Sequence, residues 1–191
     1  MKATVNSYTW GMPAPDKTSL GAIVHAARQL VESDGLPGLT MQSVAQRVGV
    51  RAPSLYKRVG NRDELIRLVA EAALSDLSDA LRAAPDLYRL AEAFRSFGHL
   101  HPAAFQLIMA PGAGVPVASL AATAAVTQPV IDATRALCGE ARGLDAARTL
   151  TAWATGFIIM ENNGGFRLDG DVEEAWRFGL ERILEAIARS R

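Results

Sequence analysis

The chain has 191 residues, of which 49% are hydrophobic and 21% charged, and its formal net charge is zero. This composition is typical of a globular protein and excludes a disordered or collagen-like chain. A single cysteine, Cys138, excludes a disulfide framework or a thiolate metal cluster within one chain. Because the sequence opens without an apolar signal and its apolar runs are too short to cross a bilayer, we expect a cytoplasmic protein with no membrane partner.

The N-terminal region is predicted to be an arm followed by a helix. Residues 1–16 are polar and include Gly11, Pro13 and Pro15, which favours a flexible arm. From Lys17 onward, apolar residues recur at spacings of three and four, the pattern of an amphipathic helix. The run "SDGLPG" (33–38) ends this helix, because Gly and Pro interrupt helical structure.

Two short helices separated by a tight turn follow. Thr40 has the residue type of an N-cap, Gly49 can end the helix in a left-handed conformation, and Pro53 suits the first turn of the next helix. The stretch 40–62 carries five Lys or Arg and no acidic residue, although the whole chain is neutral. A helix-turn-helix with an exposed basic side fits double-stranded DNA, whereas a solvated basic face on a structural bundle is the alternative.

The rest of the chain is predicted to be helical as well. Asn61 resembles the N-cap of a long helix that reaches about Ala83, with two acidic residues in its first turn. Further helices are expected near 86–99, 102–110, 116–138, 144–162 and 171–189, separated by Pro102, the 110–114 run, Gly139 with Gly143, and the 162–170 run. The predicted fold class is all-α with about nine helices: a helix-turn-helix domain at 17–62 joined by a long helix to a C-terminal bundle at 63–191.

The sequence "GLTMQSVAQRVGVRAPSLYKRVGNRDELIRLV" (38–69) resembles the N-terminal domain of the tetracycline-repressor (TetR) family of bacterial transcription regulators. The shared elements are a Gly-Leu-Thr start, an Ala-x-x-Val-Gly-Val turn, a Pro-x-Leu-Tyr recognition helix and an Asn-Arg-Asp-Glu-Leu helix start. The resemblance implies an all-helical homodimer whose C-terminal domain binds a small ligand and dimerises.

The resemblance also implies which residues contact DNA. Thr40, Tyr56 and Lys57 would hold phosphates; Arg51, Ala52, Pro53 and Ser54 would face the groove; Gln42, Ser43 and Arg62 complete the set. Arg51 departs from the family, which usually has Ser or Thr as the cap of the recognition helix. Either this helix end frays, at a cost of about 0.5–2 kcal/mol, or Arg51 contacts a guanine edge or a phosphate. We favour the second interpretation.

The C-terminal half resembles a TetR subfamily that carries a Trp-His-Gly signature. Trp153 and Gly156 match this signature, but Thr155 replaces its histidine. Aromatic and Met residues lie along the predicted helices at helical spacing, which is typical of a core but also of an apolar ligand pocket. The candidate ligand residues are Phe94, Phe97, His101, Phe105, Met109, Trp153, Phe157, Met160 and Glu161. For Glu161 the alternatives are exposure at a helix end, which we favour, and a counter-charge for a cationic ligand.

Dimerisation is expected to use the last two long helices. Their apolar stripes give the candidate interface residues Leu144, Ala147, Ala154, Ile158, Trp176, Gly179, Leu180, Ile183 and Ile187. A glycine within a helix, such as Gly179, is costly unless another group packs close to it. No metal site or cofactor is expected, since His99 and His101 point apart on a helix and no Cys or carboxylate lies close to them in sequence.

The sequence therefore predicts a DNA-binding transcriptional regulator, in particular a repressor that binds a palindromic operator as a dimer and is released by a small, mostly apolar ligand. One alternative is an architectural DNA-binding protein with a filled core and no ligand. Another is an all-helical enzyme with a vestigial DNA domain, although no catalytic motif is present.

Overall fold

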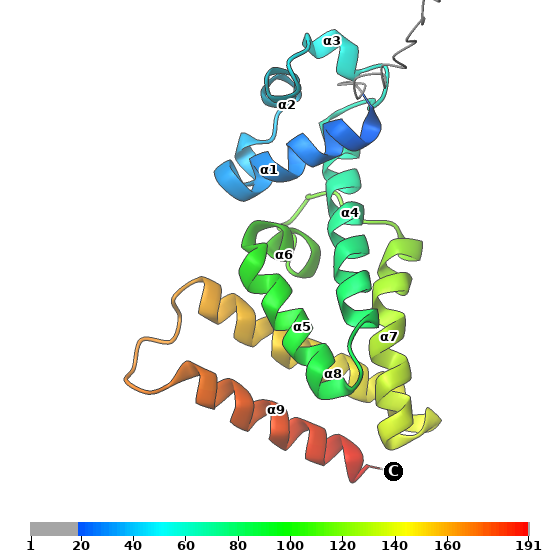
Figure 1. Cartoon of the computed structure of the whole chain (residues 1–191), viewed down its shortest axis with the longest axis vertical. Helices are drawn as coiled ribbons and strands as arrows, with labels where there is room; N and C mark the ends of the chain where they lie inside the picture. The colour runs from blue at the N-terminus through cyan, green and yellow to red at the C-terminus, as the bar shows by residue number, and fades with distance from the viewer. Residues whose placement is uncertain (1–18, 191) are drawn as a thin grey trace, which may run out of the picture.

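A computed structural model describes residues 19–190, so the predicted arm at 1–16 lies outside the described residues. Within this range all the regular secondary structure is helical, which confirms the all-α fold class (Figure 1). The helices are α1 (Leu20–Gly38), α2 (Met41–Val48), α3 (Ala52–Leu55), α4 (Arg62–Arg82), α5 (Leu87–Leu100), α6 (Pro102–Met109), α7 (Leu120–Cys138), α8 (Glu140–Asn162) and α9 (Val172–Ala188).

The predicted start and stop signals of the first helices are confirmed. Gly35 interrupts α1 with φ 68°, so the helical path breaks within the "SDGLPG" run. The Thr40 side chain caps α2 by accepting a hydrogen bond from the Ser43 amide, and Gly49 follows α2 in the left-handed conformation. Asn61 caps α4 by accepting from the Glu64 amide at 2.8 Å. Together these signals fix the geometry of the helix-turn-helix.

The C-terminal helices agree with the predicted ones except at two boundaries. The expected helix at 116–138 begins only at Leu120, because Ser119 is extended and caps α7 through its hydroxyl. The expected helix at 144–162 begins earlier, at Glu140, and Gly143 lies inside it. Gly143 is needed there since the Arg135 side chain of α7 occupies the place where a β-carbon would lie. It therefore permits close packing of α7 on α8 rather than ending a helix.

Two hydrophobic cores share α4, which runs along the middle of the molecule (Figure 1). The N-terminal core joins α1, α2 and α3 to the first half of α4, as far as Ala70. The second core joins the rest of α4 to α5, α6, α7, α8 and α9. Leu107 of α6 is buried in the N-terminal core although α6 belongs to the C-terminal half of the chain. The two units are therefore packed together through both α4 and α6.

Candidate nucleic-acid interface and ligand cavity

The basic side of the helix-turn-helix is open to solvent. Leu55 and Val59 are buried against the N-terminal core, which turns the other side of this segment outward. Arg51, Pro53, Tyr56 and Lys57 are exposed, as are Thr40 and Gln42, whereas Ala52 and Ser54 are half-buried. This surface forms the end of the molecule farthest from α9 (Figure 1). An exposed end with cationic side chains suits a polyanionic duplex.

The α3 helix is short and has an unusual first residue. It spans only Ala52–Leu55, and Arg51 occupies the N-cap position without a side-chain capping hydrogen bond. The predicted absence of a cap is thus confirmed. Because the Arg51 side chain is exposed at the start of α3, its guanidinium is available for an external acceptor.

Ser43 and Arg62 hold the backbone instead of facing outward. The Ser43 hydroxyl donates to the Gly38 carbonyl at 2.8 Å and accepts from the Thr40 amide, which completes a capping box. Arg62 donates from Nε to the Leu39 carbonyl at 2.6 Å and from Nη2 to the Leu36 carbonyl at 2.7 Å. The structure therefore gives both residues a role in fixing the α1–α2 connection to its neighbours, and their contact with DNA stays a prediction.

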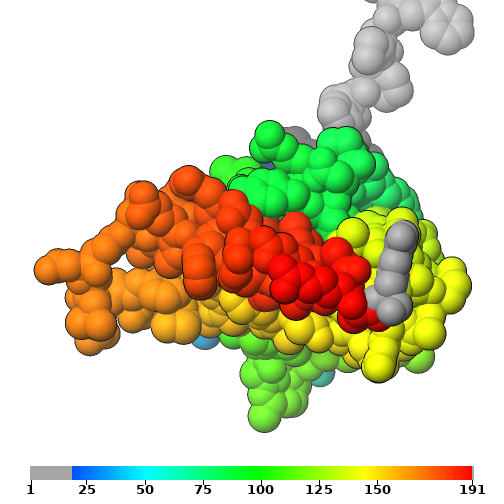
Figure 2. Space-filling view, turned by 90° about the horizontal axis from the view of Figure 1, so that it is seen from below, coloured from blue at the N-terminus to red at the C-terminus, as the bar shows by residue number. Residues whose placement is uncertain are grey.

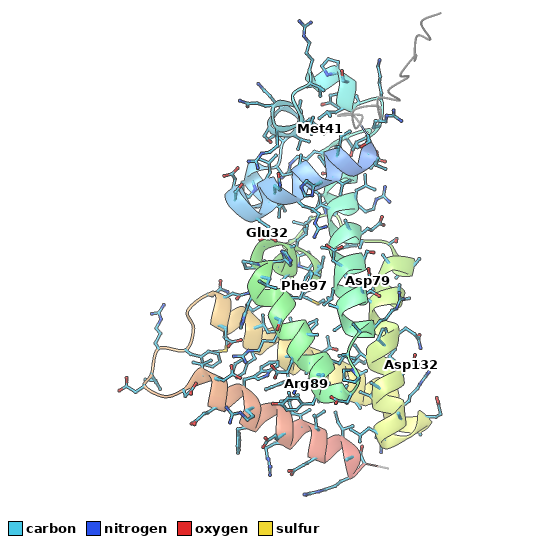
Figure 3. The ribbon with its side chains drawn as sticks, viewed as in Figure 1. Glu32, Met41, Asp79, Arg89, Phe97 and Asp132 are labelled. Carbon is cyan, nitrogen blue, oxygen red and sulfur yellow. The ribbon has the colours of Figure 1, made fainter. Side chains whose placement is uncertain are left out.

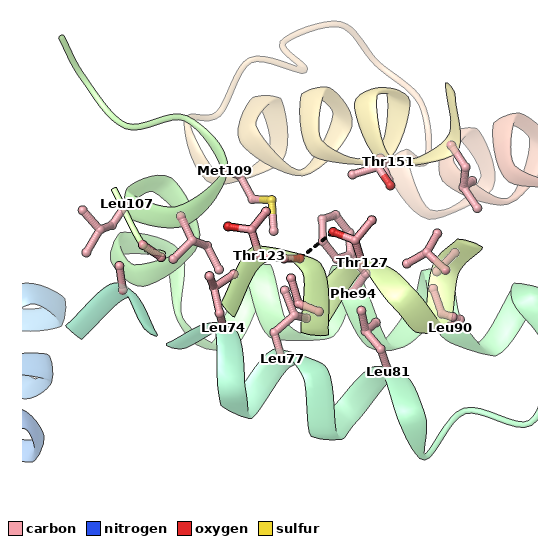
Figure 4. A pocket seen from close by; sticks show the side chains of 18 of the residues that line it. Leu74, Leu77, Leu81, Leu90, Phe94, Leu107, Met109, Thr123, Thr127 and Thr151 are labelled. Atoms are coloured by element: carbon pink, nitrogen blue, oxygen red, sulfur yellow. Dashed lines mark hydrogen bonds between the residues drawn. The ribbon is translucent and has the colours of Figure 1, made fainter. Parts of the chain in front are cut away.

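A cavity of about 270 Å³ lies among α4, α5, α6, α7 and α8 (Figure 4). Its walls are leucines, alanines, valines and a few larger apolar residues, together with three threonines. Of the predicted ligand residues, Phe94 and Met109 line it. The residues missed by the sequence analysis include Leu74, Leu77, Leu107, Thr123, Thr127 and Thr151. No sequence signal marks these residues. The spacing of apolar residues on a helix face is the same whether that face packs against other side chains or lines a cavity.

Most of the other predicted ligand residues take part in aromatic packing and do not line the cavity themselves. Phe105 meets Phe94 edge to face with ring centroids 5.2 Å apart, and Phe97 lies beside His101 at 5.1 Å. Trp153 stacks on Trp176 at 4.7 Å, and Phe157 packs edge-on against the same ring. Met160 is exposed. The structure thus places Phe97, His101, Phe105, Trp153, Phe157, Met160 and Glu161 outside the lining of the cavity.

Glu161 is paired with a buried arginine, so neither alternative considered for it was right. Arg95 of α5, only 7% exposed, donates to Glu161 from Nε and Nη2 at 3.1 and 2.6 Å, and to Glu173 of α9 at 2.6 Å. His99 also contacts Glu161 at 3.0 Å. Burial acts to lower the pKa of Arg95, but its hydrogen bonds and charge interactions with the two carboxylates outweigh this and raise the pKa above its ordinary value. This cluster ties α5, α8 and α9 together.

The predicted dimer residues are mostly internal, which is a second correction. Ala147, Ala154, Ile158, Trp176, Leu180 and Ile187 are buried in the core of the single chain and have no surface for a partner. Ile183 is partly buried against the same core, and Gly179 packs on the Trp153 ring. Only Leu144 is well exposed. The apolar stripes of α8 and α9 pack these helices against their own subunit. An apolar stripe has the same helical spacing whether it packs inside one chain or against a partner chain, so the sequence pattern could not distinguish the two.

Comparison with known proteins identifies the family of this chain. Residues 23–69 match the model of the bacterial regulatory proteins of the tetR family, and residues 87–183 match that of the tetracyclin repressor-like C-terminal domain. The chain is a member of the TetR family. It is accordingly a DNA-binding transcriptional regulator, in a family whose members are generally not enzymes, are generally dimers and bind small ligands.

Individual TetR family proteins agree with this assignment. An uncharacterized HTH-type transcriptional regulator of Mycobacterium tuberculosis is 29% identical over 164 residues, which cover 78% of this chain and 73% of that protein. The class E tetracycline repressor of Escherichia coli is 36% identical over 59 residues, 31% of this chain and 28% of the repressor. The structure of a TetR variant of Acinetobacter baumannii in complex with minocycline has the same fold, with a TM-score of 0.67 and 21% identity over 91% of this chain and 98% of that chain.

Three further features were considered from the sequence: the subfamily, a membrane helix and a metal site. The Trp-His-Gly subfamily remains a prediction, because neither matched description names this signature. None of the described helices is long and apolar enough to cross a membrane. Within residues 19–190, no group of three or more His, Cys, Asp or Glu side chains is arranged to hold a metal ion.

Proposed function

We propose that this TetR family protein is a repressor that binds a palindromic operator as a homodimer and is released when a small, mostly apolar molecule fills the cavity. The observation that carries the proposal is the position of the cavity. Ala70 of α4 and Leu107 of α6 both line it and both belong to the core of the DNA-binding unit. A molecule in the cavity would therefore contact the same side chains that pack the DNA-binding unit against the rest of the chain.

A polar contact adds to this connection between the two units. The Glu32 carboxylate of α1 accepts hydrogen bonds from the Ala103 and Ala104 amides, at 3.2 and 3.0 Å, at the start of α6. These amides have no partner within their own helix, and a negative charge at a helix N-terminus is favourable. Figure 3 shows Glu32 between α1 and α6. A shift of α6 would thus be passed to α1 through Glu32 as well as through Leu107.

Ligand binding changes DNA affinity only if the ligand prefers one arrangement of the DNA-binding units. Each factor of ten in this preference corresponds to about 1.4 kcal/mol. In a two-fold dimer the two α3 helices would lie about 34–36 Å apart when they read successive major grooves. A ligand that favours a different spacing would release the duplex. The alternative considered from the sequence is an architectural DNA-binding protein with a filled core. The open cavity at this position favours ligand binding over that alternative.

The dimer is proposed to form through the outer faces of α8 and α9. Figure 2 shows α9 lying across one face of the molecule with its outer side uncovered. Phe178 of α9 is 67% exposed, and Leu144 and Met160 of α8 are also exposed. Gly156 of α8 has open space where a β-carbon would lie, so a second helix could approach closely there. Aromatic residues, Met and Arg are enriched at protein–protein interfaces, and Arg182 lies over the exposed Phe178 ring.

The proposal is tested by joining ligand screening to DNA binding. Duplexes that bind the protein are first selected from a random pool, and uncharged apolar compounds are then screened for those that raise its melting temperature with concentration. We expect at least one stabilising compound to weaken binding of the selected duplex. If none of the stabilising compounds changes duplex affinity, the protein is a DNA-binding protein without ligand control and the proposal fails.

A further inference from the structure

We propose that the molecule recognised by the cavity is uncharged and largely apolar, and that it carries a hydrogen-bond-accepting oxygen held by the Thr151 hydroxyl. This inference rests on the proposed function, because it takes the cavity as the ligand site. It goes further by naming the charge and the polar group of the ligand. Three observations support it: the residues that line the cavity, the hydrogen bonds that two of its three threonines make and the third does not, and the position of the buried charges outside the lining.

The lining excludes a charged ligand. No Asp, Glu, Lys, Arg or His is among the residues that line the cavity. An ion moved from water into an apolar site needs a counter-charge or several hydrogen bonds, and without them its desolvation opposes binding. Arg95 and Glu161, which could have supplied a charge, bind each other and lie outside the lining. A neutral molecule does not have this desolvation cost when it enters the cavity.

The three threonines of the wall differ in what their hydroxyls can offer (Figure 4). Thr123 donates to the Ser119 carbonyl at 3.1 Å, and Thr127 donates to the Thr123 carbonyl at 2.7 Å. Their hydrogens are therefore used by the backbone of α7. Thr151, on α8, makes no side-chain hydrogen bond in the described part of the chain, although the Thr149 hydroxyl on the same helix donates to the Asp145 backbone carbonyl. Thr151 is thus the lining hydroxyl whose hydrogen remains for a ligand.

The size of the cavity limits the ligand further. A volume of about 270 Å³ is near the lower end of the range of about 300–1,000 Å³ for small-molecule sites. At roughly 30 Å³ for one water, it corresponds to about nine water-sized groups, so a molecule of roughly nine or more non-hydrogen atoms has room. Val117 and Thr123 line the cavity and are exposed, so the opening lies between the 110–119 segment and α7. A compact ring system with one carbonyl or ether oxygen has the required chemistry.

The charge is tested with two fluorescent probes that share one apolar body. N-phenyl-1-naphthylamine is neutral, and 8-anilino-1-naphthalenesulfonate has the same body with an added sulfonate. We expect the neutral probe to bind the full chain at least tenfold more tightly. Ala154→Phe, which places a ring in the cavity, should abolish this binding. Circular dichroism and a melting curve establish that the variant is folded. Ala91→Phe, which changes a lining residue of α5, serves as a second variant that fills the cavity.

The oxygen is tested with two competitors of nearly equal shape. 2-Acetylnaphthalene has a ketone oxygen, whereas 2-isopropylnaphthalene has a methyl group in its place. The ketone should displace the neutral probe about two- to tenfold better from the wild-type protein, the usual worth of one hydrogen bond. Thr151→Val keeps the shape of the side chain but removes its hydrogen, so this preference should vanish. Thr123→Val is the matched control and should keep it, because the Thr123 hydrogen already binds the backbone.

The outcomes separate the failure of this inference from that of the proposed function. If the neutral probe does not bind, or if both cavity-filling variants leave its binding unchanged, the cavity is not a ligand site and both proposals fail. If the cavity-filling variants abolish binding but the sulfonate probe binds equally well, the cavity is a ligand site and the assigned charge is wrong. If Thr151→Val leaves the ketone preference intact, the assigned oxygen contact is wrong.

Discussion

Arg95 shows how a single buried charge can organise three helices. Its guanidinium lies 4.8 Å from the centre of the Trp176 ring and donates to carboxylates from α8 and α9. Because the pKa of Arg95 is raised, its contribution to stability is fully present below the pKa of an unfolded arginine. That contribution is lost only as the pH rises through the still higher folded value. Titration of this residue therefore does not change stability in the neutral range.

The two carboxylates bound to Arg95 should differ in importance. Glu161 is 11% exposed and Glu173 is 55% exposed at the side chain. Glu161→Ala removes the buried partner of a buried charge and should lower the free energy of unfolding by about 3 kcal/mol. Glu173→Ala removes a partner in contact with solvent and should cost less than about 1 kcal/mol. Urea unfolding of both variants measures the difference, and equal losses would show that the Arg95–Glu161 pair is not the main contact.

On the DNA surface, Arg51 and Lys57 should have separable roles. Lys57→Ala should weaken binding to all duplexes alike and reduce the slope of log K against log salt by about one, because one phosphate contact is lost. Arg51→Ala should instead relax the preference at particular base pairs, by about 1–3 kcal/mol for a guanine contact. Binding to a library of duplexes at several salt concentrations measures both effects. An unchanged binding profile for both variants would count against the α2–α3 surface as the DNA interface.

At the scale of helices, the attachment of α9 depends on a glycine. A β-carbon at Gly179 would come within 2.5 Å of the Trp153 ring of α8. The close approach expected around this residue is confirmed, but the group that approaches belongs to the same chain. Trp153 in turn stacks on Trp176 of α9, so the helices interlock at this point.

This packing predicts the effect of filling the space at Gly179. Gly179→Ala should destabilise the protein by about 1–3 kcal/mol, since the rigid indole must move. Gly21→Ala is the matched control. Gly21 lies in α1 with nothing within 4 Å of a β-carbon, so alanine there should be neutral or stabilising by up to about 1 kcal/mol. Thermal unfolding distinguishes the two, and a stabilised Gly179→Ala would contradict the packing of α9 on α8.

For the whole molecule, the central question is how two chains pair to present two α3 helices on one face of a duplex. The buried stripes of α8 and α9 leave the outer faces of the same helices for a partner. An isologous contact across these faces has the two-fold symmetry that a palindromic operator requires.

The proposed interface is tested by placing a charge on it. Phe178→Glu should shift the protein from dimer to monomer in sedimentation velocity, because burying a carboxylate on each subunit in place of an apolar ring is unfavourable. The matched control is Leu100→Glu, at the end of α5, where the leucine is 74% exposed and lies outside the proposed face. It should leave the mass unchanged. A dimer that persists in Phe178→Glu would place the interface elsewhere.

The sequence determined the local structure of this protein to a large extent. Capping residues such as Thr40 and Asn61, the left-handed Gly49 and the spacing of apolar residues all act within one or two turns of a helix. Such signals require no knowledge of distant contacts, and the helix-turn-helix follows from them. The family motif between residues 38 and 69 then connected this geometry to DNA.

Only the tertiary structure decided which apolar faces are core, cavity or free surface. Trp176 and Leu180 lie on a stripe that suits a dimer as well as a core, and the periodicity is the same in both cases. The cavity arises where side chains from five helices fail to fill the space between them, and the Arg95–Glu161 pair joins residues 66 positions apart. These features depend on the relative placement of whole helices, which no short stretch of sequence encodes.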